Sequence, residues 1–342
     1  APRLLGVGST LPARRASQSE LCEEIGSLLE LSGAELAQWQ RICRGSGVDF
    51  RHAVAPLAQV IRSSTAERMR LFDASAPELA AGAARQALVD AGGEAHEVTD
   101  LVVVTCTGFS APGVPRRLID LLALRPSVRS SQVGFMGCFG GICGLRAAAA
   151  HASAERGAVV LLVSVELCSL HLRADRDPQN LVASALFSDG AAAAVIVDGE
   201  VCTGGTADRR QGRSAPASLL PGRSHTVAGT LDAMGWTITD MGFAMTLARE
   251  VPDRLREVLP DLVESAREVL IHPGGPSIID AAADSLRPEQ RGATEVSRAI
   301  LREMGNMSSA SILFVLERWR RQGGVAPASL VAFGPGLTID SV

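Results

Sequence analysis

Short, continuous apolar runs alternate along the chain with longer segments that have helical periodicity. A run that is apolar at every position and has the length of a strand is typical of a strand covered on both faces. Such runs lie at residues 100–106, 158–165, 191–197 and 330–334. Helical patterns lie beside them at residues 78–91, 116–124, 142–156, 276–286, 294–304 and 307–320. The pattern therefore predicts an α/β fold whose sheets are covered by helices.

The order strand, helix, strand recurs along the chain. Cys138 and Asn306 are 168 residues apart, and each follows a glycine just before a long helical segment. The same shift places His272 opposite Val104, which ends an apolar run. This recurrence predicts an internal duplication with pseudo-two-fold symmetry. The polar, Gly-, Pro- and Arg-containing stretch at 199–223 marks the boundary, and we divide the chain into halves at 1–205 and 206–342.

Length and hydrophobic content set the size of the core. The chain has 342 residues, of which 46% are hydrophobic, enough for one large or two closely packed α/β domains. No apolar run approaches the roughly 20 residues that a membrane-spanning helix needs, and the first residues lack a secretory signal pattern. We therefore expect no membrane span and a cytoplasmic location.

Cysteines and charges narrow the function classes. Seven cysteines at irregular spacing predict free thiols in a reducing compartment, and no CxxC pair suggests zinc. The formal net charge is −4, lysine is absent, and the arginines are scattered among acidic residues instead of forming a basic stripe. We therefore expect neither a metal site nor a nucleic-acid partner.

Cys138 is the strongest candidate for chemistry. It lies between an expected short apolar strand and the Ala-rich helix at 142–156. Unpaired N–H groups and the dipole at a helix N-terminus favour an anion, so this position favours a thiolate. His272 and Asn306 occupy similar positions at a strand end and a helix start, and we interpret the three residues as one site.

Five motifs in order extend the argument over nearly the whole chain. They are Gly-Cys-Phe-Gly-Gly at 137–141, Leu-Phe-Ser-Asp-Gly-Ala-Ala-Ala at 186–193, His-Pro-Gly-Gly-Pro at 272–276, Gly-Asn-Met-Ser-Ser-Ala-Ser at 305–311 and Phe-Gly-Pro-Gly-Leu-Thr at 333–338. In them the chain resembles the bacterial type III polyketide synthases, which are chalcone-synthase-like members of the thiolase superfamily. The resemblance implies a five-layered αβαβα fold made of two duplicated halves, and a homodimer.

The resemblance also implies a reaction: iterative decarboxylative Claisen condensation of malonyl-CoA onto a CoA-linked starter, with no cofactor besides these coenzyme A thioesters. Cys138 would carry the growing chain as a thioester, and His272 would pair as imidazolium with its thiolate. His272 and Asn306 would then stabilise the enolate formed when malonyl-CoA loses CO₂.

Further residues are implied as parts of the substrate-binding walls. Phe187 and Phe243 match two aromatic gatekeepers, although the pattern alone favours core residues. Glu166, Ser308 and Cys106 match a polar network near the nucleophile, with a thiol at Cys106 where plant members have threonine; Ala111 replaces a methionine that reaches the partner's cavity. The remaining implied positions are Cys168, Gly305, Gly334 and Pro335. Arg44 and Arg51 would bind CoA phosphates or serve as structural arginines.

Three other functions remain open. A ketoacyl synthase III-like enzyme would share the Cys, His and Asn but condense once and use acyl carrier protein. A non-catalytic partner subunit usually lacks the nucleophile, and a Cys hydrolase needs an accessible water. The starter is also open, with fatty acyl-CoA or malonyl-CoA favoured over a phenylpropanoid, and a resorcinol, pyrone or related phenolic as product.

Overall fold

Two sheets organise the protein, which we describe from a computed structural model for residues 1–199 and 215–342. The first sheet has six strands in the order β5-β4-β6-β7-β1-β8, and the second has four in the order β12-β13-β14-β9. The bounds of the first set are β1 Arg3–Thr10, β4 Asp100–Val104, β5 Arg129–Val133, β6 Val159–Leu167, β7 Asp189–Val197 and β8 Ala217–Ser218. Those of the second are β9 Ser224–Thr226, β12 Glu268–Ile271, β13 Ala328–Gly334 and β14 Thr338–Ser341.

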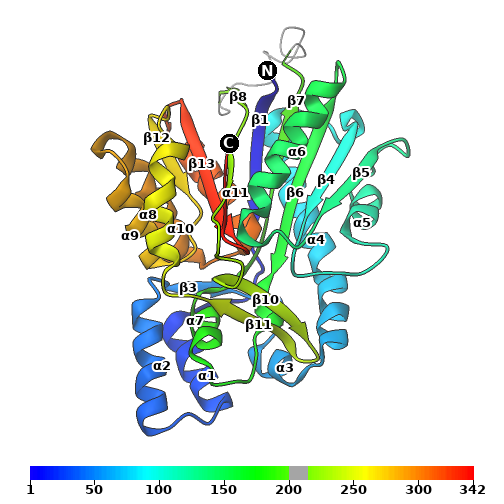
Figure 1. The fold of residues 1–342 in the computed structure, drawn as a ribbon. Helices are drawn as coiled ribbons and strands as arrows, with labels where there is room; N and C mark the ends of the chain where they lie inside the picture. The colour runs from blue at the N-terminus through cyan, green and yellow to red at the C-terminus, as the bar shows by residue number, and fades with distance from the viewer. Residues whose placement is uncertain (200–214) are drawn as a thin grey trace.

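Helices form three further layers around the two sheets (Figure 1). Helix α4 (Thr65–Ala91), with α5 (Val114–Leu121) beside it, covers the outer face of the first sheet. Helices α6 (Gly140–Ala154) and α11 (Ser311–Arg321) lie between the sheets. Helices α8 (Val251–Leu262) and α9 (Pro276–Ser285) cover the second sheet from outside, and α10 (Thr294–Met304) packs beside α9 and α11. The predicted α/β class and the five-layered arrangement are confirmed.

Alternation along the strands shows why both faces need cover. Leu101 and Val103 of β4 pack into the outer core with α4, whereas Val102 and Val104 pack into the central core with α6 and α11. Successive side chains of a strand point to opposite faces, so a strand buried on both faces is apolar throughout. The continuous apolar runs of the sequence have this cause.

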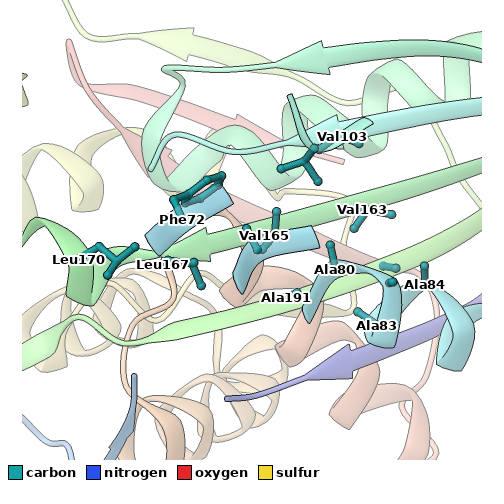
Figure 2. Packing of buried hydrophobic residues seen from close by; sticks show 14 of the residues in the cluster. Phe72, Ala80, Ala83, Ala84, Val103, Val163, Val165, Leu167, Leu170 and Ala191 are labelled. Atoms are coloured by element: carbon teal, nitrogen blue, oxygen red, sulfur yellow. The ribbon is translucent and has the colours of Figure 1, made fainter. Parts of the chain in front are cut away.

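Small residues allow α4 to lie close to the first sheet. Figure 2 shows alanines of this helix, among them Ala80, Ala83 and Ala84, packed against valines of the strands. A Cβ atom added to Gly6 of β1 would lie only 2.3 Å from the backbone nitrogen of Ala91. This close approach requires glycine on the strand and alanine on the helix.

Pairing within the sheets confirms the duplication. Strand β4 is parallel to β6, which is antiparallel to β7; in the other half, β12 is parallel to β13, which is antiparallel to β14. Short turns of 3₁₀ helix, Gly137–Phe139 and Ser308–Ala310, precede the two central helices. The halves are unequal, because the described part of the second sheet has fewer strands.

The structure corrects one sequence-based expectation and leaves another untested. The strand before Cys138 was expected to be apolar, which is wrong: β5 reads Arg-Ser-Ser-Gln-Val and is largely exposed, because it lies at the edge of its sheet. The predicted boundary at 205/206 lies outside the described residues, so it stays a prediction. Strand β8 follows that boundary and yet pairs with β1 of the first half.

A cap of smaller elements lies across one end of the sheets (Figure 1). It contains the hairpin of β10 (Met234–Thr239) and β11 (Gly242–Leu247), and helix α7 (Pro178–Leu186). Helices α1 (Gln18–Leu28), α2 (Gly33–Gly45) and α3 (Leu57–Arg62), with the short strands β2 (Arg15–Ser17) and β3 (Phe50–His52), complete it. The hairpin and α7 contact each other and carry many of the cavity residues described below.

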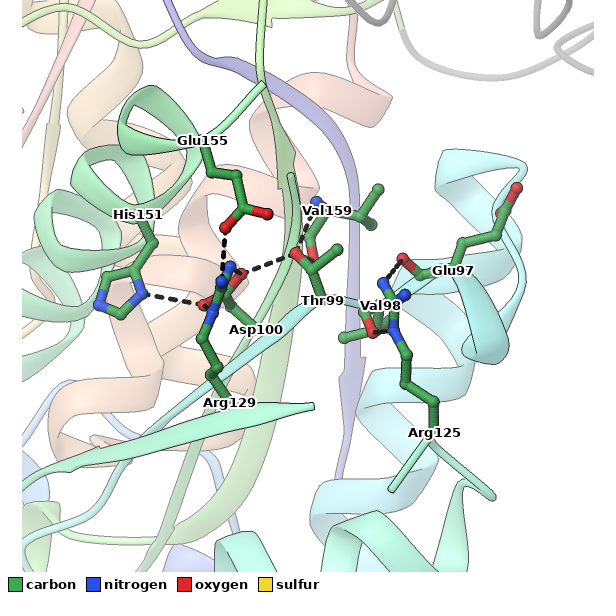
Figure 3. A network of polar contacts seen from close by, with 9 residues as sticks. All are labelled: Glu97, Val98, Thr99, Asp100, Arg125, Arg129, His151, Glu155 and Val159. Atoms are coloured by element: carbon green, nitrogen blue, oxygen red, sulfur yellow. Dashed lines mark hydrogen bonds and ion pairs between the residues drawn. The ribbon is translucent and has the colours of Figure 1, made fainter. Parts of the chain in front are cut away.

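A polar network holds the start of β4 (Figure 3). The buried Asp100 carboxylate accepts two hydrogen bonds from Arg129, one from Thr99 and one from His151. Burial opposes its ionisation, but these hydrogen bonds outweigh burial and lower the pKa of Asp100 to about 2. The network fixes the edge of the first sheet.

Within the described part of the chain, no helix has the length and apolar character needed to cross a membrane.

Candidate active site

A cavity of about 900 Å³ lies under the cap, and residues of both halves line it. Cys138, His272 and Asn306 all contribute to its wall. They come from three connections: the turn before α6, the end of β12, and the segment between α10 and α11. The structure therefore brings the three sequence-predicted residues to one cavity.

Cys138 lies in the 3₁₀ turn that leads into α6. Gly137 precedes it with φ of +65°, and a Cβ atom there would lie 2.6 Å from Pro335 and 2.9 Å from Trp236. Glycine permits this backbone conformation and this approach, whereas a side chain here would be strained and would collide with its neighbours. The half-buried thiol of Cys138 donates to Ser308 Oγ over 3.7 Å.

His272 follows the last residue of β12 and is fully buried. Its backbone N–H donates to the carbonyl oxygen of Val331, which continues the parallel pairing with β13. The imidazole packs edge-on against Phe333, with ring centroids 5.6 Å apart. Both ring nitrogens are buried, and neither has a hydrogen-bond partner among the described residues.

The Asn306 amide is held in one orientation. Its Oδ1 accepts from the backbone N–H of Ser308 at 2.8 Å, so Nδ2 points the other way and donates to the carbonyl oxygen of Gly274 at 3.3 Å. Its backbone N–H donates to the carbonyl oxygen of Leu186, and a β-bridge links Asn306 to Phe187. These bonds tie the segment around Asn306 to the end of α7.

Burial shifts the pKa values of both Cys138 and His272. It raises the pKa of the Cys138 thiol to about 12 and lowers the pKa of His272 to about 3. A helix N-terminus favours an anion by at most about 2 kcal/mol. That is less than the roughly 4 kcal/mol separating a thiol pKa of about 12 from the ordinary 9. Burial therefore opposes both charges of the expected imidazolium–thiolate pair, which stays a prediction.

Glu166 accepts hydrogen bonds from several residues behind the cavity wall near Cys138. The fully buried carboxylate accepts from the backbone N–H of Cys106 at 3.0 Å, from the hydroxyl of Thr107 at 2.6 Å, and from Ser309. Cys106 Sγ in turn accepts from the Gly137 N–H at 3.1 Å. Burial raises the pKa of Glu166. Cys106 and Ser308 line the cavity, whereas Glu166 acts from behind the wall.

The other predicted wall residues divide into two groups. Phe187, Phe243, Cys168 and Pro335 line the cavity. Gly305 and Gly334 do not, but both allow close packing next to it: a Cβ atom on Gly305 would meet Leu186 and Ser188, and one on Gly334 would meet Phe139.

The two arginines assigned to CoA phosphates have different surroundings. Arg51 is 5% exposed, and its guanidinium donates to the carbonyl oxygens of Ser184 and Phe187 at the end of α7. The prediction that Arg51 binds CoA is therefore wrong, because its charge is directed into the protein. Arg44 is exposed on α2 and does not line the cavity, so its role stays a prediction.

Several cavity residues were missed from the sequence. His171, Thr107, Trp236 and Met245 also line the cavity, and Ser309 binds Glu166 from behind it. His171 stacks on Phe243 with ring centroids 3.6 Å apart. The signal for His171 was weak: it lies five residues after Glu166, but in a segment with no regular pattern.

Among residues 1–199 and 215–342, no group of three or more His, Cys, Asp or Glu side chains is arranged to hold a metal ion.

Comparison with known proteins agrees with this geometry. The family model for chalcone and stilbene synthases, N-terminal domain, matches residues 2–200, and that for the C-terminal domain matches residues 213–342. A 1,3,6,8-tetrahydroxynaphthalene synthase from Streptomyces peucetius subsp. caesius is 33% identical over 98% of this chain and 91% of its own length. A bisdemethoxycurcumin synthase from Oryza sativa subsp. japonica is 31% identical over 89% of this chain and 82% of its own.

A solved structure shares the whole architecture. The C-terminal type III polyketide synthase domain of Steely1, a type I/III hybrid from Dictyostelium, superposes with a TM-score of 0.88 at 29% identity, covering 99% of this chain and 98% of that one. Matched family models over both halves, relatives above 30% identity and a shared fold lead to one conclusion. The chain belongs to the chalcone and stilbene synthase family and is an acyltransferase of the type III polyketide synthase kind.

Proposed function

We propose that this enzyme loads an acyl group from coenzyme A onto Cys138, extends it with malonyl-CoA by decarboxylative Claisen condensation, and cyclises the product. The observation that carries the proposal is the meeting of Cys138, His272 and Asn306 on one cavity of about 900 Å³. Exchange of one thioester for another is close to energetically neutral, which suits a cysteine as the acyl carrier.

We assign His272 as the base of the loading step, because burial favours a neutral imidazole beside a neutral Cys138 thiol. As Cys138 Sγ attacks the thioester carbonyl, neutral His272 accepts the thiol proton and the coenzyme A thiolate departs. The proton then passes from the imidazolium to coenzyme A. The Asn306 amide, held by Ser308 and Gly274, offers a donor to the developing oxyanion.

The same residues serve the extension step. When malonyl-CoA loses CO₂, negative charge moves to its thioester oxygen as an enolate. Donors from His272 and Asn306 would stabilise that charge. The enolate carbon would then attack the carbonyl carbon of the Cys138 thioester, and the bond from that carbon to Sγ would break, so that the Cys138 thiolate leaves and the lengthened chain is carried on coenzyme A. Removing one such donor typically lowers the rate by about 10²- to 10³-fold.

The substrates we propose are malonyl-CoA as extender and malonyl-CoA or a fatty acyl-CoA as starter, with no separate cofactor. The Streptomyces relative is named for a tetrahydroxylated aromatic. That name supports a polyhydroxylated aromatic as the product class here, although a pyrone remains an outcome of the test. We retain the cytoplasmic location as a prediction.

A homodimer is also part of the proposal. Strand β5 is an exposed sheet edge, and Phe135 just after it is 53% exposed. Phe109, 38% exposed, stacks on Phe243 of the cavity wall and is followed closely by the exposed Ala111. An open edge beside exposed aromatic rings supports pairing with a second copy, which would then border the cavity.

The test incubates the purified enzyme with labelled malonyl-CoA, alone and with fatty acyl-CoA starters. We expect a labelled acyl group on Cys138 and a product containing at least two malonyl-derived units. Cys138→Ala should abolish both, whereas Cys143→Ala, on α6 and outside the cavity, should keep them. Reaction once, and only with malonyl-acyl carrier protein, would favour the ketoacyl synthase alternative. A folded protein inert in both assays would favour a partner subunit.

A further inference from the structure

The β10–β11 hairpin forms part of the cavity wall, yet it belongs to neither of the two large sheets. Its side chains Trp236, Phe243 and Met245 line the cavity. Backbone hydrogen bonds join the hairpin to the rest of the protein near its base and at its turn, where the Thr65 N–H donates to the carbonyl oxygen of Asp240. The outer edge of β11 must therefore be held by other contacts.

Two side chains of α7 pair with that edge. The Met245 N–H donates to Asn180 Oδ1 at 2.9 Å, and the Leu247 N–H donates to Gln179 Oε1 at 2.6 Å. Met245 and Leu247 are two residues apart, so their N–H groups lie on the same edge of β11, the one that β10 does not occupy. The two amides supply the acceptors that a third strand would supply, and they join α7 to β11 where both elements line the cavity.

A series of polar contacts orients the Asn180 amide. Its Nδ2 donates to Asp175 Oδ2 at 3.1 Å, so Oδ1 faces Met245. The same Asp175 oxygen accepts from Arg173 Nε at 2.6 Å, and Arg173 Nη1 donates to Thr239 Oγ1 at 2.9 Å. Arg173, Asp175 and Asn180, which we call the bracket, therefore hold the hairpin both at the end of β10 and in the middle of β11.

The bracket is partly shielded from solvent. Asn180 is 9% exposed, and the side chains of Arg173 and Asp175 are each 25% exposed. Salt screens a partly buried ion pair less than an exposed one, and loss of the Asn180 amide would leave the Met245 N–H without its acceptor. No bracket residue belongs to either large sheet, so loss of these contacts should free β11 from α7 without unfolding the sheets.

We propose that Asn180 is a positioning residue: held by Asp175 and Arg173, it fixes the separation of β11 from α7 and so keeps the cavity closed around the growing polyketide. The inference rests on the proposed function. A closed wall excludes water from the acyl-enzyme. Where the wall opens, water adds to the carbonyl carbon of the thioester and the carbon–sulfur bond breaks, which gives a free acid and the Cys138 thiol before extension is complete.

Two bracket variants and one matched control test the proposal. Asn180→Leu keeps a side chain of similar shape but removes both hydrogen bonds of the amide, and Arg173→Gln breaks the bracket at its other end. Arg176→Gln removes a positive charge from the same segment, but Arg176 binds Glu35 and the carbonyl oxygen of Leu29, outside the bracket. Hydrogen–deuterium exchange is measured without substrate. Labelled malonyl-CoA then gives the rate of CO₂ release and the ratio of fully extended product to shorter free acids.

We expect faster exchange in a peptide covering residues 243–248 in both bracket variants, with unchanged exchange in β4 and β6. The product ratio should fall by about threefold to tenfold, the worth of one neutral hydrogen bond, and CO₂ release should fall less than the ratio does. Arg176→Gln should match the wild type in exchange and in product ratio.

Wild-type exchange of β11 in the bracket variants would overturn the inference, and so would faster exchange with an unchanged product ratio. An equal fall in CO₂ release and product ratio would show general damage to the site and would also overturn it. If Asn180→Leu does not fold, Arg173→Gln decides alone. Wild-type enzyme that makes no polyketide would overturn the proposed function together with the role in product formation; the exchange result, which needs no substrate, separates that failure from a failure of the bracket.

Discussion

At the scale of single residues, desolvation decides the chemistry of the site more strongly than charge pairing. His272 is fully buried, and burial alone lowers its pKa to about 3. Cys138 shows the matching effect, with burial raising the pKa of its thiol to about 12. In the proposed mechanism, a neutral pair would keep the resting site free of a thiolate until a thioester is bound.

The neutrality of His272 predicts a pH-dependent stability difference. Between pH 7.5 and 5 an unfolded histidine takes up a proton, while folded His272 does not until its much lower pKa is reached. Stability from this residue is therefore present above the unfolded pKa of about 6.5 and is lost as the pH falls. Relative to His272→Gln, we expect the wild type to lose about 2 kcal/mol of unfolding free energy over that interval.

Denaturant unfolding at several pH values measures this difference. The buried carboxylates and His171 are common to both proteins, so their titration cancels in the comparison. The exposed His96→Gln serves as the control and should track the wild type. If the difference in unfolding free energy between wild type and His272→Gln is constant with pH, His272 takes up protons equally in the folded and unfolded states, which would contradict the prediction.

At the scale of elements, glycines set how closely the two central helices approach. A Cβ atom on Gly141 of α6 would lie 2.3 Å from the carbonyl oxygen of Ser309 and 2.8 Å from Ile312 of α11. Ser309 also donates to Glu166 and shares a hydrogen bond with Ser164. The contact therefore joins the packing of the two halves to the network behind Cys138.

Gly141→Ala should destabilise the protein by about 1 to 3 kcal/mol, because the added carbon meets backbone atoms that cannot turn aside. It should also lower the condensation rate by displacing Ser309. Gly292→Ala is the matched control, since a Cβ atom there meets nothing within 4 Å. Unfolding free energies of the two variants compare them directly; equal values would show that the helices have room to separate.

The observed bounds of helix α4 and strand β5 show which local sequence patterns predicted these elements correctly. The helix predicted at 78–91 begins at Thr65, because Ser64 and Glu67 form a capping box and the helix continues through Pro77. A proline usually marks a helix boundary, and here packing of the alanine-rich face overrides it. The strand expected before Cys138 exists as β5, but its residues are largely polar, since an exposed edge strand needs no apolar residues.

At the scale of the whole molecule, the open edge at β5 predicts the assembly. Phe135→Glu places a charge on the exposed ring position next to this edge, and we expect it to shift the protein from dimer to monomer. Val89→Glu, at a side chain that is 68% exposed on α4, should leave the dimer intact. Light scattering after size-exclusion chromatography gives both masses. A monomeric wild type would contradict the dimer, and an unaffected Phe135→Glu dimer would place the interface elsewhere.

The sequence by itself predicted the class of the fold and the three residues of the candidate site that meet on the cavity. Strands buried on both faces must be apolar throughout, so they can be recognised from the sequence alone. The duplication can be recognised in the same way, because it repeats the same strand-to-helix junctions. The motifs around Cys138, His272 and Asn306 are local, because each joins the end of a strand or helix to the next element.

Only the tertiary structure decided protonation, and which side chains face the cavity. Arg51 and Arg44 lie in one basic segment, yet one is buried against α7 and the other is exposed. His171 meets Phe243 only because η3 (Cys168–His171) and the β10–β11 hairpin pack together. Burial depends on segments far apart in the chain, and a pKa shift depends on burial, so neither can be read from neighbouring residues.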